Sequence, residues 1–230
     1  MNEITTEIAE ALGKEQDEPL KRVIANKVDA WRSTLIVRSL QKHPEERKFF
    51  TQTVYVPMIL ANEIPCPTPF NACQVAKSKL YVPKPMRLGN ELFEYVGSID
   101  GQNPFKEAAV GTSQFLAKGR WMQKVVFWEY ENKSIRIRGN DLTPYTNRLP
   151  MIRIDGVFDN PRAVMAYNCR NNQGNCDYWD NPYPVTGDIK QMIVQYILQV
   201  DYGMKPTNDS VPEVEVAGNE PIQYAKAIRH

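Results

Sequence analysis

The chain of 230 residues is 42% hydrophobic and 24% charged, and its formal net charge at pH 7 is +1. This composition predicts a globular protein with one substantial core or two small ones, and it excludes a global field that would draw the protein to nucleic acid or an anionic membrane. The first twenty residues carry acids where a secretory signal needs basic residues. No run approaches the roughly eighteen apolar residues of a membrane span. We therefore expect a protein of the cytoplasm, where disulfides are rare.

Charge is unevenly distributed over the first fifty residues. Residues 1–18 hold six acidic side chains against Lys14 alone, whereas residues 19–48 hold eight basic side chains against three acidic ones. Two interpretations are open. The charges belong to solvated helix faces that keep the protein soluble, or the acidic start of one copy contacts the basic helix of a neighbour.

The first fifty residues have helical periodicity. Ile4, Ile8 and Leu12 recur every four residues, and Gly13 ends this pattern. A second apolar stripe begins after Pro19, which suits a first helical turn, and it runs to about His43. Its members are Leu20, Val23, Ile24, Val28, Trp31 and Leu35. We expect a long N-terminal helix that buries this stripe.

Residues 49–158 change to a β-rich pattern. Short runs of β-branched and aromatic residues, separated by Pro, Gly, Asn and Asp, predict strands within 49–60, 78–83, 92–99, 121–130, 134–139 and 151–158. Residues 129–139 read as a hairpin. The loops at 64–74, 83–90 and 100–115 are long and rich in proline and glycine, so we expect them to contact a partner.

The last third returns to helical patterns. Asp159 or Asn160 can cap a helix in which Pro161 occupies the first position. A further helix begins at residues 186–188 and is expected to bury Ile189, Met192, Ile193, Tyr196 and Ile197. Residues 204–230 have no sustained period and predict an extended arm that becomes ordered against a partner.

These patterns together predict an α+β fold. Residues 1–48 and 159–203 form a helical bundle, in which the long N-terminal helix packs with the C-terminal helices. Residues 49–158 form an inserted β-rich region with long loops, and residues 204–230 form the arm.

No motif of an enzyme is present. The chain lacks glycine-rich nucleotide loops, His-Glu-x-x-His and Gly-x-Ser-x-Gly, and its two histidines are His43, beside a proline, and His230. Asp177, Asp180 and Asp188 do not have the spacing of a calcium loop, and aspartate is common in turns. We therefore expect a protein that is not an enzyme and that holds no cofactor.

The four cysteines raise the possibility of a zinc site. Cys66 and Cys73 are separated by six residues, and so are Cys169 and Cys176. Structural zinc sites pair cysteines two to four residues apart, so this spacing fits a metal poorly. We expect free thiols in loops and small core positions, and no bound metal.

Residues 152–198 carry a resemblance to a known family. They read "IRIDGVFDNPRAVMAYNC", then a Cys-Asp-Tyr loop with a Tyr-Pro element, then a helix that opens with Gly-Asp. This run resembles the C-terminal part of the head-to-tail connector proteins of podovirus-type tailed phages, and it is most similar to the neck ring proteins of crAss-like phages. "KFFTQTVYVPMI" and "EYVGSIDGQNPF" support the same resemblance.

The resemblance implies a structural virion protein made in the cytoplasm of the bacterial host. Twelve copies would form a ring between portal and tail, and DNA would pass through its channel without sequence recognition. The implied partners are other copies, the portal and tail or neck proteins, with no membrane. Our candidate interface residues are Arg22, Arg32, Arg38, Asp159, Asn160, Asp177, Tyr178, Tyr183, Asp188 and Tyr224.

Two alternatives stay open. One is a nucleic-acid-binding module that uses the basic helix at 19–48 together with Arg136, Arg138 and Arg153. The other is a small metal-binding protein or hydrolase built on the four cysteines and the loop from Asp177 to Asp188. Salt-dependent DNA binding would favour the first, and bound zinc would favour the second.

Overall fold

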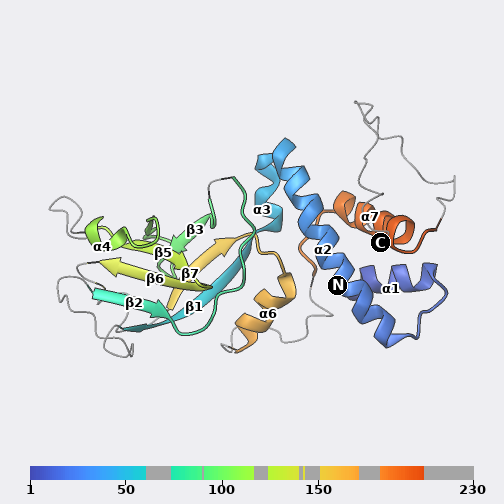
Figure 1. The fold of residues 1–230 in the computed structure, drawn as a ribbon, viewed down its shortest axis with the longest axis horizontal. Helices are drawn as coiled ribbons and strands as arrows, with labels where there is room; N and C mark the ends of the chain where they lie inside the picture. The colour runs from blue at the N-terminus through green and yellow to red at the C-terminus, as the bar shows by residue number, and fades with distance from the viewer. Residues whose placement is uncertain are drawn as a thin grey trace, which may run out of the picture.

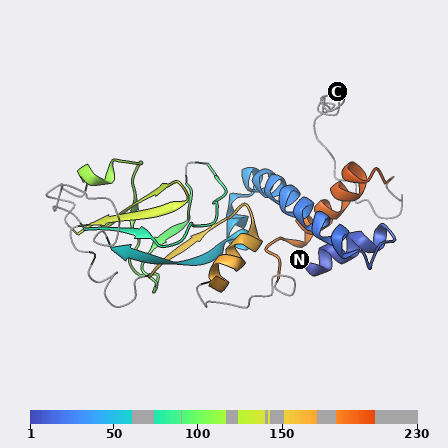
Figure 2. The same cartoon turned by 60° about the horizontal axis from the view of Figure 1, so that its bottom comes forward.

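The computed structural model describes residues 1–60, 74–89, 91–116, 124–139, 142, 151–170 and 182–204. These residues form an elongated molecule with a strongly curved sheet at one end and a group of helices at the other (Figure 1). A view turned by 60° keeps the two parts at opposite ends, with one helix crossing between them (Figure 2).

The helical end begins with α1 (Asn2–Ala11) and α2 (Glu18–Lys42). Gly13 ends the first helical segment with φ of +65°, in the left-handed region that favours glycine. Asp17 then caps α2, since its side chain accepts a hydrogen bond of 2.9 Å from the backbone N–H of Leu20. Pro19 lies in the first turn, where a missing N–H costs nothing.

The third helix of this end is α7 (Gly187–Tyr196), which continues into the π-helical turn η4 (Ile197–Asp201). It packs against α1 and α2 and buries Ile189, Ile193 and Ile197 as expected. Met192, however, is 36% exposed, so the prediction that it is buried is wrong. The three helices share one apolar core whose helical members include Ile4, Ile8, Ala9, Ile24, Ala25, Val28, Leu35 and Ile36.

Trp31 lies at the edge of this helical core and is only half-buried. Its ring stacks on Tyr196, with the ring centroids 4.8 Å apart, and its indole N–H donates to the carboxylate of Asp201 at 3.1 Å.

We therefore expect Trp31→Ala to lower the free energy of unfolding by about 2 kcal/mol, below the 3–5 kcal/mol typical of a fully buried aromatic. Urea unfolding measures this. An effect under about 0.5 kcal/mol would contradict the structural role of the stack.

The other end of the molecule is a mixed seven-stranded sheet in the order β3-β7-β1-β2-β6-β5-β4. Neighbouring strands are antiparallel except β4 and β5, which are parallel. The strands are β1 (Gln52–Leu60), β2 (Gln74–Ser78), β3 (Tyr95–Gly97), β4 (Lys106–Glu107), β5 (Phe127–Glu131), β6 (Ser134–Gly139) and β7 (Met151–Gly156).

The sheet curls into a nearly closed barrel. β1 pairs with β7 through residues 52–57 and then with β2 through residues 58–60, so one strand belongs to both halves of the sheet. The first and last strands in the order approach each other at a bridge between Gly97 and Pro104, beside a hydrogen bond of 2.7 Å from Phe105 N to the carbonyl of Val96. Closure of this kind removes most of the unpaired backbone that an open sheet presents at its edges.

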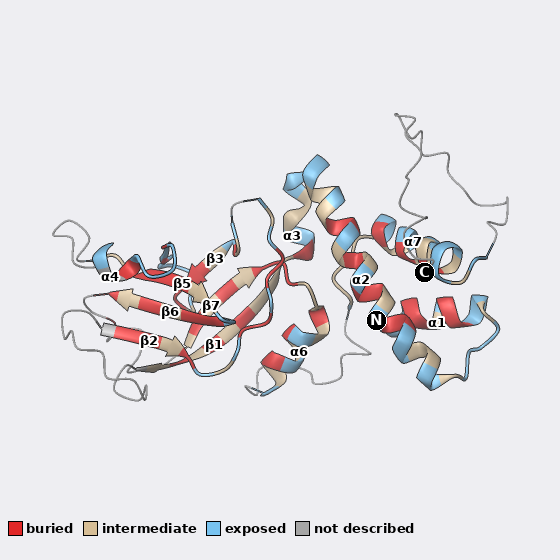
Figure 3. Ribbon diagram, in the orientation of Figure 1, coloured by how far each residue is buried: buried red, intermediate tan, exposed pale blue. Residues whose placement is uncertain are grey.

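Buried residues lie along the strands of the barrel (Figure 3). Their side chains form one hydrophobic core. In β7 the residues alternate between buried and half-buried, which is the period of two expected for a strand with one face in a core. Phe93, from the segment before β3, lies in this core and contacts the rings of Trp128, Tyr130 and Phe158 at centroid distances of 5.5, 5.6 and 6.1 Å.

Four further helical segments complete the described chain. They are η1 (Pro44–Glu46), α3 (Arg47–Phe50), α4 (Ser113–Leu116) and α6 (Pro161–Arg170). α6 packs on β1, since Val164 and Tyr167 belong to the barrel core and the Asn168 side chain donates to the carbonyl of Thr53 at 3.1 Å.

The predicted fold class, α+β built on a helical bundle with a long N-terminal helix, is wrong. The structure is a β-rich fold whose larger core is the barrel. The bundle fails because α6 buries its apolar side against the sheet and not against α2, so the helices do not form one core.

Individual strands match the sequence patterns to different degrees. The hairpin at 129–139 is confirmed as β5 and β6, joined through Asn132 and Lys133 at φ of 51° and 61°. The pairing is typical of a two-residue turn with both central residues in the left-handed region. The strand expected at 78–83 is wrong, because β2 ends at Ser78. The arm predicted at 204–230 lies outside the described residues apart from Met204.

Candidate functional site

A buried polar junction joins the helical end to the barrel end. At its centre is Arg32 of α2, whose side chain is fully buried. Its guanidinium donates to the carbonyl oxygen of Phe158 at 2.9 Å and to that of Pro184 at 3.1 Å. Phe158 follows β7, and Pro184 precedes α7. One arginine of α2 therefore binds two segments that lie 126 and 152 residues further along the chain.

Asp29, one turn before Arg32 on α2, supplies the negative charge of the junction. It is only 7% exposed. Its carboxylate accepts hydrogen bonds from the guanidinium of Arg162 on α6, with Nε at 2.8 Å, and from the hydroxyl of Tyr183 at 2.6 Å. The guanidinium of Arg162 also donates to the side chain of Asn26 at 2.7 Å. α2, α6 and the segment before α7 thus meet at one carboxylate.

Burial changes the acid–base behaviour of two groups in this junction. Burial lowers the pKa of Arg32, and the negative charge of Asp29 opposes that change. Burial also raises the pKa of Tyr183, and the nearby Asp29 carboxylate raises it further. Tyr183 is therefore a neutral hydrogen-bond donor at any physiological pH. The Arg32 guanidinium lies 5.7 Å from the centre of its ring, within range of a cation–π contact.

The structure brings four of the predicted site residues into or beside this junction: Arg32, Asp159, Asn160 and Tyr183. The backbone carbonyl of Asp159 accepts from the hydroxyl of Ser33 at 3.1 Å, and its carboxylate pairs with Lys84 at 2.6 Å. Asn160 caps α6, since its side-chain oxygen accepts from the N–H of Ala163 at 3.1 Å. These contacts lie within one chain. A role for the four residues between copies stays a prediction.

The remaining predicted site residues are dispersed. Arg22 and Arg38 are exposed on α2, and Asp188 is exposed in the first turn of α7. Asp177, Tyr178 and Tyr224 lie outside the described residues.

Sequence reasoning missed Asp29 and Arg162 as partners in the junction. The sequence does indicate that Arg32 of α2 is buried. Arg32 follows Ile24 and Val28 at four-residue steps, so it occupies the next position of a buried apolar stripe. A charged residue at such a position needs a buried partner. Asp29 is near in sequence, but nothing in the sequence indicates the partner on α6, because it lies 133 residues away.

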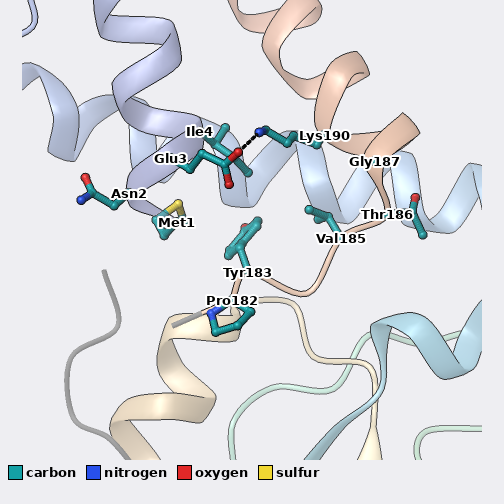
Figure 4. A pocket seen from close by; sticks show the side chains of 10 residues that line it. All are labelled: Met1, Asn2, Glu3, Ile4, Pro182, Tyr183, Val185, Thr186, Gly187 and Lys190. Atoms are coloured by element: carbon teal, nitrogen blue, oxygen red, sulfur yellow. Dashed lines mark hydrogen bonds and ion pairs between the residues drawn. The ribbon is translucent and has the colours of Figure 1, made fainter. Parts of the chain in front are cut away.

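A surface pocket of about 490 Å³ adjoins the junction between the start of α1 and the start of α7. Figure 4 shows Tyr183 and Val185 on one side of it and Met1 and Ile4 on the other. The Lys190 ammonium pairs with the carboxylate of Glu3 across its rim, and Glu7 lies 3.5 Å from the same ammonium. Part of the acidic face of α1 is therefore neutralised by α7 of its own chain.

Half of the basic side chains in segment 19–48 are engaged within the chain. Lys21 pairs with Glu18, Lys27 pairs with Asp201, and Arg47 pairs with both Glu91 and Glu94. With Arg32 buried, the exposed cations of this segment that remain outside such pairs include Arg22, Arg38, Lys42 and Lys48. Arg136 and Arg153 are paired with Glu131 and Asp155 on the barrel. This arrangement lacks the continuous basic stripe expected of a nucleic-acid interface.

Cys169, near the end of α6, is disulfide-bonded, so the expectation of a free thiol is wrong at this position. The other three cysteines, Cys66, Cys73 and Cys176, lie outside the described residues. A bonded sulfur is not a thiolate, so Cys169 in this state does not fit a four-thiolate zinc site. Within the described ranges, no three His, Cys, Asp or Glu side chains gather in a way that could hold a metal ion.

The helices of the described residues include none with the length and apolar character needed to cross a bilayer. α2 has enough residues, but charged side chains are distributed along it.

Comparison with known proteins gives the family. No curated protein matches the sequence. A family model described as phage tail ring protein 2, of the crAss-like phages, matches residues 3–212. The match extends well beyond the run at 152–198 that carried the resemblance, and it confirms that resemblance. Because it covers nearly the whole sequence, the chain belongs to the phage tail ring protein 2 family and is a ring protein of the crAss-like phages.

Proposed function

We propose that this protein is a subunit of the head-to-tail connector, a ring between the portal and the tail of a podovirus-type phage. The match to the tail ring family over residues 3–212 carries the proposal. Membership in that family implies that copies associate with one another in a ring and that the protein is a component of the virion. The protein acts structurally, without catalysis, and it is made in the cytoplasm of the bacterial host before it enters the neck.

The buried junction supports this role. A connector subunit must transmit force between its portal end and its tail end without bending. Arg32, Asp29 and Arg162 provide buried, charge-assisted hydrogen bonds between the helices and the barrel. Such bonds are roughly twice as strong as neutral ones and fix geometry. The subunit is therefore built as one stiff, elongated unit, suited to stand side by side with its neighbours.

In the assembled connector, twelve copies surround a channel through which DNA passes during ejection, with no recognition of its sequence. The helices of adjacent subunits contact one another, and the barrel end meets tail or neck proteins. The engagement of Lys21, Lys27 and Arg47 in ion pairs within the chain favours this structural role over a dedicated nucleic-acid-binding module.

Electron microscopy of the purified protein mixed with purified portal tests the proposal. We expect an added ring on the portal with twelvefold symmetry, because symmetric contacts repeat once per subunit. Portal alone serves as the control and should show no added density. If no complex forms at micromolar concentrations of both proteins, the protein does not bind the portal directly, and the proposed position in the neck is wrong.

A further inference from the structure

Two adjoining cavities form one groove along the C-terminal half of α2. The first has a volume of about 330 Å³ and the second about 490 Å³. They share Val37 and Gln41, so they are continuous across the exposed side of the helix. The opposite wall is the segment that carries Met86 and Leu88. We call this feature the α2 groove. It runs from Ser33 to Gln41 on α2 and on to Pro44 of η1, and Asp159, whose carboxylate pairs with Lys84, also lines it.

The α2 groove has an apolar floor and a basic rim. Val37, Leu40, Met86 and Leu88 supply the apolar surface, and Met86 is only 4% exposed. Arg38 and Arg87 are exposed at the rim. Neither arginine forms an ion pair with a described residue, unlike Arg47 nearby. A segment that offers apolar side chains together with free carboxylates is the complementary ligand.

The sequence of this chain contains such a segment after its last described residue. Between positions 205 and 220 it carries Asp209, Glu213, Glu215 and Glu220 against Lys205. Within that stretch, Glu213, Val214, Glu215 and Val216 alternate. In an extended conformation the two valines point to one side and the two glutamates to the other. The valines then suit the floor of the α2 groove, and the longer glutamate side chains reach toward its rim.

The length of the α2 groove agrees with the length of a short extended segment. The part of α2 that lines the groove, residues 33–41, is about 13 Å long at 1.5 Å per residue, and Pro44 of η1 extends the groove beyond it. Six residues of extended chain, such as 211–216, span about 20 Å at 3.3 Å per residue. One short run of the C-terminal segment is thus enough to fill the groove from end to end.

The position of the chain end favours a neighbouring copy as the donor. Asp201 pairs with Lys27 at 2.8 Å and accepts from Trp31, so the chain leaves η4 on the side of α2 that faces α7. Val37 lies about 120° around the helix from Trp31, on a different side of α2. Figure 1 shows α7 on one side of α2 and the barrel on the other. The α2 groove is lined by Met86 and Leu88, from the segment between β2 and β3, and by no residue of α7 or η4.

We propose that residues 209–216 of one copy bind in the α2 groove of a second copy, with Val214 and Val216 on the apolar floor and Glu213 and Glu215 near Arg38 and Arg87. This contact would join adjacent subunits of the ring. This proposal goes beyond the proposed function. The contact forms between two copies of the chain, and it does not require the portal or DNA.

A binding experiment with a fluorescent peptide of residues 205–220 tests the contact. The receptor is the full chain carrying Glu213→Lys and Glu215→Lys, whose own segment no longer competes, at a concentration where sedimentation shows a monomer. We expect saturable binding that weakens as salt is added. Arg38→Glu with Arg87→Glu, placed in a receptor that keeps its own Glu213 and Glu215, should weaken it about tenfold or more. The matched control, Lys14→Glu with Lys79→Glu, reverses two exposed charges outside the groove and should change the dissociation constant less than about twofold.

A charge exchange makes the test specific. A peptide carrying Glu213→Lys and Glu215→Lys should recover binding to a receptor that carries Arg38→Glu and Arg87→Glu and keeps its own Glu213 and Glu215, which the reversed groove repels. Absence of binding up to millimolar peptide, or equal loss in the groove and control variants, would overturn the proposal. A third result would also overturn it: the dilute wild-type monomer does not bind the peptide, while the receptor with Glu213→Lys and Glu215→Lys does. The segment of each wild-type chain would then occupy the groove of the same chain. None of these results depends on the portal, so a failure here is distinguishable from failure of the connector role.

Discussion

Asp29→Ala is expected to lower the free energy of unfolding by about 3–5 kcal/mol, the range found when one partner of a buried ion pair is removed. The substitution leaves Nε of Arg162 and the hydroxyl of Tyr183 without their acceptor, and it removes the Asp29 charge that lies near fully buried Arg32. Urea unfolding followed by tryptophan fluorescence and by circular dichroism measures the loss. We expect the same shift from both probes, because the junction joins the two cores.

Asp188→Ala is the matched control for this experiment. Asp188 is an exposed carboxylate in the first turn of α7, where its interaction with the helix dipole is worth about 1 kcal/mol at most. A loss for Asp29→Ala no larger than that of the control would show that the junction does not stabilise the fold. A loss detected by only one probe would show instead that the helices and the barrel unfold independently.

The second large effect is expected in the barrel core. Phe93→Ala removes a ring that contacts Trp128, Tyr130 and Phe158 and that is only 5% exposed. We expect a loss of about 3–5 kcal/mol, from lost transfer free energy and the cavity left behind. For a chain of this length, that loss corresponds to a melting temperature lower by about 10 °C. Differential scanning calorimetry measures the change.

Tyr81→Ala provides the comparison for Phe93, since Tyr81 is an aromatic residue that is 73% exposed. Its removal should alter stability by no more than about 0.5 kcal/mol. If both variants melt at the wild-type temperature, the aromatic cluster around Phe93 is not part of the cooperative core, and other side chains hold the barrel interior together.

Local structure was predictable where the sequence carries a local physical signal. The capping of α6 by Asn160, the start of α7 at residues 186–188 and the turn at Asn132 and Lys133 each depend on a few neighbouring residues. β3 lies within the strand predicted at 92–99. β4 falls in the stretch predicted as a loop at 100–115, because it has two residues and is defined by its pairing with β5. Barrel closure depends on long-range pairing as well, which explains why the fold class was mispredicted as a helical bundle.

The candidate site also combines features that have a local sequence signal with contacts between distant residues that have none. The position of Arg32 in an apolar stripe is a local signal, and so is the Asp-Asn-Pro turn at 159–161. The contacts that give these residues their environment join positions separated by 126 to 154 residues. A single sequence carries no record of such pairs. For the same reason, Asp29 reads in sequence as one of three acids in a basic helix and is in fact the acceptor on which three elements converge.

The bridge between Gly97 and Pro104 has a consequence for how copies of this protein can meet. A sheet with two open edges offers a template on which strands of other molecules can add without limit, and this is a common route to insoluble aggregates. In the described part of this chain, the first and last strands of the sheet lie next to each other at this bridge. Few backbone groups at the sheet edges are therefore free to pair with another molecule. We therefore expect subunits to recognise one another by the shape and charge of their side chains. Recognition of that kind can end at a closed circle, whereas strand addition has no natural stopping point.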